Sequence, residues 1–342
     1  MAENPTRQEV AALLVSWKVL EKRRAAALLR SERSALSSLT AVAREHVHAA
    51  ADRLDGLSHA PGTARLVGLR AIQQTSATLR DGLTQAITDT RSDARQVSQE
   101  RTAAEFQHLR KLLRKDGWGE DELPPDPSPA DADHDAIAAA NAAASLASRW
   151  GILALGALRS WEDNPASSLQ QAIRSTVSSA PGAVSLLPAV SRTAATETAT
   201  AFNEEHLDAL EPLSDYDWAP GLFKVWSALL DGRVCQRCFE NDGEAVPVNA
   251  AFRSGDDIPL HPYCRCIPVP LYIPRPRSLE DVAIDYAGYK AEIRDLIREG
   301  RAKPVDDEGR HAASFIARSR FPRSPIVISK DFTSGRLSRP RR

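Results

Sequence analysis

The feature that most constrains the fold of this sequence is a cluster of cysteines. All four cysteines of the 342-residue chain lie between Cys235 and Cys266. They come as two close pairs, CQRC and CRC, and His261 stands three residues before Cys264. Random placement would group four cysteines this closely about once in a few hundred chains, so the grouping indicates a shared role.

Two close pairs separated by a loop are what a tetrahedral zinc ion requires, because each pair supplies two ligands and the loop lets the pairs meet. The C-x-C spacing strains a shared tetrahedron, since alternate residues of a strand diverge from one ion. Either all four cysteines bind zinc, or His261 replaces one cysteine of the CRC pair. Five residues therefore compete for four positions: Cys235, Cys238, His261, Cys264 and Cys266.

Three other interpretations of the cluster stay open. One or two disulfides would form if the protein left the reducing cytosol in which we expect it to fold. Thioredoxin-like redox chemistry would need the C-x-x-C to open a helix after a strand within a βαβ unit, and we find no βαβ pattern in this sequence. A catalytic zinc ion would keep one coordination position open and use a nearby carboxylate as a base, with candidates at Asp231, Glu240, Asp242 and Glu244.

The rest of the sequence predicts a mainly α fold with a small α+β region towards the C-terminus. Residues 1–115 are rich in alanine and leucine at helical spacing and begin with a capping box at Thr6 and Glu9, so we expect an antiparallel helical bundle. We interpret the many Arg and Glu residues of this segment as its solvated face.

A sharp change of composition follows the predicted bundle. Residues 116–135 hold eight acidic residues, four prolines and no Lys or Arg, which predicts an exposed linker. Helical patterns resume at 136, and short β-like runs such as LFKVWSAL, AVPV and CIPVPLYI follow, up to about Pro274. We therefore divide the chain into a helical bundle (1–115), a linker (116–135), a domain with the Cys/His cluster (136–275) and a C-terminal extension (276–342).

Between Lys224 and Pro270, Trp226 is followed by DGRVCQRC, an Asp-Gly pair at Asp242 and the sequence HPYCRC. This pattern resembles the phage Mu F-like minor head protein family, also called head morphogenesis proteins. The family pattern has a Trp, then Asp-x-Arg-x-Cys-x-x-Cys, an Asp-Gly turn and a final His-Pro-x-Cys-Arg-Cys. The upstream helix of the family carries a Thr-Glu pair and then an aromatic residue with Asn. The matching positions here are Thr196, Glu197, Phe202, Asn203, Trp226, Asp231, Arg233, Cys235, Cys238, Asp242, Gly243, His261, Pro262, Cys264, Arg265 and Cys266.

This resemblance implies a minor capsid protein that acts structurally inside the head of a tailed phage or phage-like element. Such a protein lies near the portal, helps assembly or DNA delivery, and passes through the cytoplasm of the bacterial host before it enters the virion. The resemblance implies no enzyme activity, and the sequence has no Gly-rich phosphate loop, nucleophile elbow or HExxH motif. The alternative is a zinc-dependent enzyme or nuclease-like effector.

Within this framework, zinc would act as a structural staple for a region with too little core to fold firmly alone. We expect Trp226 and Phe239 to pack beside the site. Arg265 either pairs with Asp231 or Glu197 or is simply exposed.

The predicted partners are the portal protein, the capsid interior and packaged DNA. Residues 310–342 carry nine Lys or Arg residues and one acidic residue, so we expect this basic tail to contact phosphates without reading base sequence. The longest apolar run, GILALGAL, is far short of the roughly 20 residues of a membrane helix, and the N-terminus has no pattern of a secretory signal. We therefore expect no membrane partner.

Overall fold

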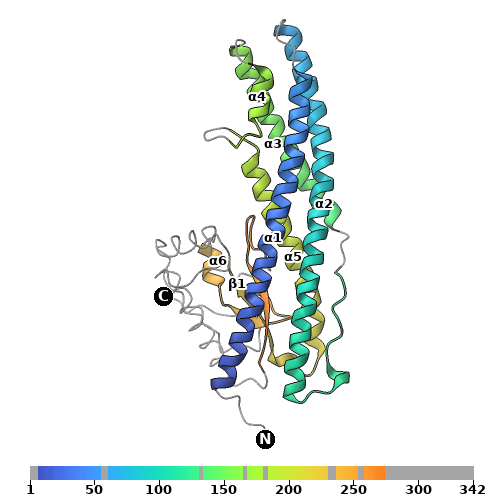
Figure 1. The fold of residues 1–342 in the computed structure, drawn as a ribbon, viewed down its shortest axis with the longest axis vertical. Coiled ribbons are helices and arrows are strands. Elements are labelled where there is room, and N and C mark those ends of the chain that lie inside the picture. Colours follow the sequence, from blue (N-terminus) through green and yellow to red (C-terminus); the bar gives the residue numbers. More distant parts are fainter. Residues whose placement is uncertain are drawn as a thin grey trace. The chain divides into compact units, whose positions relative to one another are not determined.

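The structure is a computed structural model. It describes residues 7–54, 61–130, 134–164, 168–179, 184–229, 236–252 and 258–273. This part of the chain is mainly helical and contains a small three-stranded antiparallel sheet (Figure 1). The predicted fold class, mainly α with a small α+β region in the C-terminal part, is therefore confirmed.

Long helices account for most of the described residues. They are α1 (Arg7–Arg53), α2 (Pro61–Asp116), α3 (Asp135–Asp163) and α5 (Leu187–Leu210), with the shorter α4 (Leu169–Ser175) and α6 (Gln236–Asn241). Local signals mark several ends: Ser168 caps α4 by accepting from the Gln171 amide, and α2 stops at Gly117, whose φ is 96°. At that left-handed glycine the Trp118 amide donates back to Leu113 O at 3.1 Å, as in a Schellman motif.

The chain forms two compact units, each built from segments that are far apart in the sequence. Unit 1 comprises Met1–Arg30, Arg95–Ala130 and Phe202–Arg342, and unit 2 comprises Ser31–Ala94 and Asp131–Ala201. Helices α1, α2 and α5 each contribute residues to both units. The segments expected from composition run consecutively along the chain, whereas these units alternate along it, because α1, α2 and α5 each have one part in unit 1 and the other part in unit 2.

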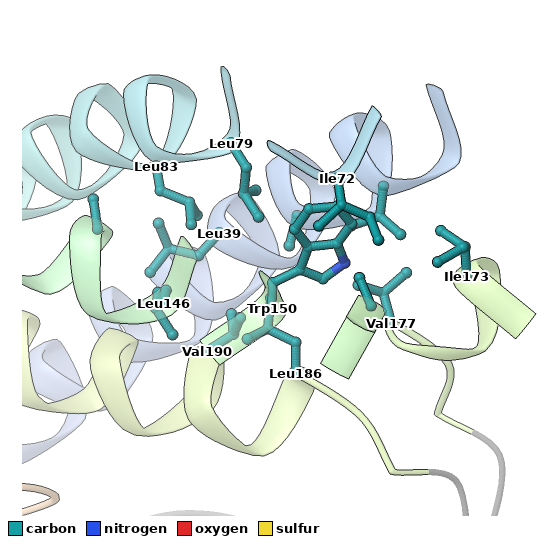
Figure 2. Packing of buried hydrophobic residues seen from close by; sticks show 14 of the residues in the cluster. Leu39, Ile72, Leu79, Leu83, Leu146, Trp150, Ile173, Val177, Leu186 and Val190 are labelled. Carbon is teal, nitrogen blue, oxygen red and sulfur yellow. The ribbon is translucent and has the colours of Figure 1, made fainter. Parts of the chain in front are cut away.

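Unit 2 has an apolar core centred on Trp150 (Figure 2). The indole is fully buried, and its Nε1 donates to Thr176 Oγ1 at 3.1 Å, so the one polar atom of the ring is satisfied. The alanine-rich pattern of α3 buries Ala139, Ala143 and Ala154 on the same helix face as Trp150, which is the spacing that an amphipathic helix requires. The larger residues around the ring are Leu39, Ile72, Leu79, Leu83, Leu146, Ile173, Val177, Leu186 and Val190.

Unit 1 contains the sheet, in the order β2-β1-β3. The strands are β1 (Leu222–Ser227), β2 (Ala245–Pro247) and β3 (Ile267–Tyr272), and the three β-like runs in the sequence correspond to them. Every residue of the central β1 is buried. Pro268 and Pro270 lie in β3, where an edge strand tolerates the missing amide donors.

The acidic, proline-rich segment is held against unit 1 over its described part, 117–130. Arg110 donates from Nε to Pro124 O at 2.7 Å, and its Nη2 lies 2.9 Å from Asp126 Oδ1. Trp218 Nε1 donates to Glu122 O at 2.8 Å. The segment thus lacks secondary structure over most of its length, as its prolines predicted, but its backbone carbonyls are bound by side chains of the unit, unlike those of a loose linker.

A search of the described helices finds none with the length and apolarity needed to span a bilayer.

Candidate metal centre

Cys238, His261 and Cys264 come together at one point in unit 1. Cys238 lies in the short helix α6, and the other two residues lie in the turn that precedes β3. Cys238 Sγ is 3.1 Å from His261 Nε2 and 3.7 Å from Cys264 Sγ. All three ligand atoms lie within 4.8 Å of one another, so a single metal ion could contact all of them.

A tight turn brings His261 and Cys264 to the same side. The Cys264 amide donates to His261 O at 2.9 Å, and Tyr263 has a φ of 68°. Proline at the second position and a positive φ at the third are the signature of a type II turn. The third position normally favours glycine, so the surroundings hold Tyr263 in a conformation that costs about 1–2 kcal/mol.

The tautomer of His261 suits a metal ligand. Its Nδ1 lies 2.7 Å from Pro262 O, and a carbonyl oxygen can only accept, so Nδ1 carries the proton. The lone pair is therefore on Nε2, the atom that faces Cys238. Metal-binding histidines in proteins commonly have this arrangement, in which a carbonyl fixes the ring orientation.

The distances fit tetrahedral zinc. Two thiolates at about 2.3 Å from a tetrahedral zinc ion lie about 3.8 Å apart, close to the 3.7 Å between Cys238 and Cys264. A thiolate and an imidazole nitrogen in the same geometry lie about 3.5 Å apart, so the His261 ring would move by a few tenths of an ångström. The donor set, two sulfurs and one imidazole, is also the one that zinc prefers.

Cys266 lies beside the three residues but is not one of them. Hydrogen bonds with Cys238 and then Cys266 lower the pKa of Cys264, whereas burial raises the pKa of Cys266 and its contacts with Cys238 and Cys264 raise it further. A metal needs the thiolate. Of the two cysteines in CRC, Cys264 is the one whose sulfur lies within 4.8 Å of the ligand atoms of both Cys238 and His261.

Two of the predicted site residues lie outside the described part of the chain. They are Cys235, which directly precedes α6, and Asp231. Cys238, Cys264 and Cys266 are not disulfide-bonded. The choice of a fourth ligand between Cys235 and Cys266 therefore stays a prediction.

The predicted aromatic support is present at Trp226. This residue is fully buried in an apolar cluster that also contains Cys238, Cys264 and Cys266. Its ring makes an edge contact with Phe252, with centroids 5.0 Å apart. The side chain of Phe239 lies outside the described residues.

The charged support residues differ from the expectation in part. Arg265 is 5% exposed, so its interpretation as a simply exposed side chain is wrong. In unit 2, Glu197 binds Arg91 at 2.8 Å, and the same guanidinium binds Asp135 at 2.6 Å. Asp242, expected in a turn, is buried and accepts from the Ala228 amide at 3.0 Å.

Sequence reasoning missed a buried polar network in unit 1, built by α1, α2 and α5. Arg24 is fully buried, and its Nη1 contacts both carboxylate oxygens of Glu105 at 3.1 Å. Arg24 Nη2 donates to Ser98 Oγ at 2.9 Å, and His206 Nδ1 lies 2.9 Å from Thr102 Oγ1. The interpretation of the Arg and Glu residues of 1–115 as a solvated face is wrong for this pair. No local pattern distinguishes a buried Arg from an exposed one on a helix of mixed composition.

Comparison with protein-family models, with curated proteins and with solved structures finds no match for this chain.

Proposed function

We propose that this protein is a structural component of a viral head, a minor capsid protein of the head morphogenesis type in a tailed phage or phage-like element. One observation carries the proposal: Trp226, Cys238, His261 and Cys264, which carry the resemblance to the Mu F-like family, lie in one compact site. Asn203, from the upstream helix of the same resemblance, contacts this region as well.

We propose zinc as the metal of the site. Cys238, His261 and Cys264 would hold it, with Cys235 as the fourth ligand and Cys266 as the competing one. Bound zinc would supply folding free energy, because it joins α6 to the turn before β3 in a region whose strands are only three to six residues long. A site with four protein ligands has no open coordination position, so the role of the ion would be structural. That the protein acts without enzyme activity is proposed from the family resemblance.

We propose the portal protein, the capsid interior and packaged DNA as partners. The case for DNA rests on the charges of residues 310–342, which lie outside the described residues. Counterion release by this tail would favour sequence-independent binding to a phosphate backbone. The portal and the virion interior as its location rest on the family resemblance alone.

The metal proposal is tested by the metal content of freshly purified, reduced protein. We expect about one zinc ion per chain. Cys238→Ser and Cys264→Ser should lose the ion, and His206→Gln, which changes a histidine outside the site, should keep it. Metal-free wild-type protein would contradict the zinc staple and favour disulfides.

Substitution of cobalt for zinc distinguishes a structural site with four protein ligands from a catalytic site with an open coordination position. A four-ligand cobalt site should give a tetrahedral absorption spectrum that added azide leaves unchanged, whereas an open position would bind azide and shift the bands. Cys266→Ser should preserve the sulfur-to-cobalt band intensity if Cys235 is the fourth ligand, and reduce it if Cys266 is.

The capsid proposal needs an assembly experiment. The protein should enter heads assembled with the portal and major capsid proteins of the same genetic element, and a chain shortened before Arg310 should bind DNA more weakly and with a flatter salt dependence. Heads that form and package DNA normally without incorporating the chain would contradict a minor capsid role.

A further inference from the structure

Asn203 connects the candidate metal centre to the helices of unit 1. It lies in α5, is fully buried, and donates from Nδ2 to the backbone oxygen of Cys266 at 2.9 Å. Its Oδ1 has no hydrogen-bond partner within the described part of the chain. A buried side-chain amide with an unsatisfied oxygen is unfavourable compared with an apolar side chain of the same size. Among the described residues, the hydrogen bond to the Cys266 carbonyl is the polar contact that offsets this cost.

The helix that carries Asn203 is held firmly at this point. The preceding residue, Phe202, accepts at its backbone oxygen from Ser98 Oγ at 2.5 Å. The guanidinium of Arg24 lies over the Phe202 ring, 5.0 Å from its centroid. Helices α1 and α2 thus fix the position from which Asn203 reaches the cysteine segment.

The segment that Asn203 binds is the one that delivers Cys264. Cys266 follows Cys264 by two residues, and the next residue, Ile267, begins β3 by pairing with Ser227 of β1. The Cys264–Cys266 segment is therefore held at its C-terminal end by both the sheet and Asn203. Without the amide, the buried carbonyl of Cys266 would lose its donor, and the path of the chain up to Cys264 would lose a constraint.

We propose that Asn203 is a positioning residue of the metal centre and that it couples metal binding to the packing of α5. This inference rests on the proposed metal site. Coupling of this kind is reciprocal: if the fixed helix favours the metal-bound position of Cys264, then bound metal favours the fixed helix. Metal loading should therefore protect α5 around Asn203 although no ligand comes from that helix.

The test compares Asn203 variants with a control variant that removes a hydrogen bond to His206, which lies one helical turn after Asn203 in α5. Asn203→Leu removes the donor at similar size, and Asn203→Asp keeps the shape but places an oxygen against the Cys266 carbonyl. Thr102→Val is the control, because it removes a different buried hydrogen bond to α5, the one to His206, without touching the cysteine segment. Zinc affinity is measured by competition with a chromophoric chelator, and hydrogen exchange is followed in peptides covering 198–210 with and without zinc.

Both Asn203 variants should bind zinc at least about tenfold more weakly, the size of effect usual for groups that orient metal ligands. They should also lose the zinc-induced slowing of exchange in α5 while the cobalt spectrum stays tetrahedral. Thr102→Val should keep wild-type zinc affinity and the zinc-induced protection, even though its overall stability falls.

Wild-type zinc affinity in both Asn203 variants would overturn the inference and leave the metal site standing. An equal loss of zinc affinity in Thr102→Val would overturn the inference too, since the effect would then reflect a general loss of packing around α5. Failure of the wild-type protein to bind zinc would instead refute the proposed metal site, so the two failures are distinguishable.

Discussion

At the scale of single residues, the pair formed by Arg24 and Glu105 stands out because both charges are buried. Their side chains are 0% and 3% exposed. Burial lowers the pKa of Arg24 and raises the pKa of Glu105, and the attraction between the two groups opposes both shifts. Such a pair adds little net stability over apolar residues of equal size, but neither charge tolerates the loss of its partner.

Arg24→Met should therefore destabilise the protein by about 3–5 kcal/mol, because the Glu105 carboxylate would stay buried without its cation. The double variant Arg24→Met/Glu105→Leu should recover most of this loss. Denaturant unfolding measures both, with Arg80→Met as a control, since Arg80 and Asp81 form an exposed pair. A single variant as stable as wild type would contradict the burial of this pair.

His206 makes the stability of unit 1 depend on pH. Its ring is fully buried, with Thr102 at Nδ1 and Glu105 Oε2 3.6 Å from Nε2. Burial, and then the charge of Arg24, hold the pKa of His206 well below its ordinary value. Below about pH 6.5, His206 therefore becomes protonated in the unfolded chain while it stays neutral in the folded chain.

We expect the stability of zinc-free protein to fall as the pH drops below about 6.5, with a slope of up to about 1.4 kcal/mol per pH unit from this one group. Glu105 acts in the opposite direction: its raised pKa means that acidification through the range just above its ordinary pKa stabilises the fold. Thermal unfolding between pH 5 and 7 checks the slope. His206→Gln should flatten it, and an unchanged slope in His206→Gln would exclude His206 as its source.

At the scale of elements, the segment 117–130 shows how irregular backbone is fixed by side chains of neighbouring elements. Arg110 binds it at Pro124 and Asp126, Trp218 binds it at Glu122, and the Ala130 amide donates to Glu205 at 3.2 Å. These contacts satisfy backbone groups that no helix or sheet ladder satisfies. The order of the segment therefore depends on a few named side chains.

Arg110→Ala should release this segment and raise its cleavage rate in limited proteolysis, because Pro124 O and Asp126 would lose their shared donor. Arg114→Ala is the matched control: it removes an ion pair with the exposed Glu120 at the start of the segment. Cleavage within 117–130 should be faster in Arg110→Ala than in wild type and nearly unchanged in Arg114→Ala. Equal cleavage in all three proteins would mean that the Arg110 contacts do not order the segment.

At the scale of the whole molecule, the two units have cores of different character. Unit 2 is held by aliphatic side chains around Trp150, and unit 1 combines apolar clusters, a buried polar network and the Cys/His site. Within the described residues, the Cys/His cluster that could hold a metal ion belongs to unit 1. If the site binds zinc, removal of the ion should therefore destabilise unit 1 more than unit 2.

Treatment of reduced protein with a strong zinc chelator should speed hydrogen exchange in peptides covering 222–229 and 258–273. Peptides covering 139–158, from the Trp150 core, should keep their protection. A second comparison uses Trp150→Ala, which should cost about 3–5 kcal/mol and increase exchange in 139–158 first. Chelation that leaves exchange in 258–273 unchanged would refute a stabilising metal in unit 1.

The local features of this protein were predictable from its sequence because neighbouring residues determine them. Spacing of alanine and leucine predicted the long helices, and the short β-like runs LFKVWSAL, AVPV and CIPVPLYI predicted the strands. The short spacing between His261 and Cys264 predicted that these two residues could lie at one metal site, and the structure brings them together. In each case a few consecutive residues set the geometry: 3.6 residues per helical turn, two per strand repeat, and four in the turn at Pro262.

Only the tertiary structure decided which polar residues are buried and which distant segments share a unit. Arg24 and Glu105 lie on helices whose sequence pattern suits solvent as well as it suits burial, and they meet across 81 positions of the chain. Asn203 likewise reaches Cys266 from 63 positions away. The free energy of a buried charge or amide depends on its partners in space, so no local pattern encodes it. The sequence by itself could therefore determine the candidate metal ligands, but not the helix that positions them.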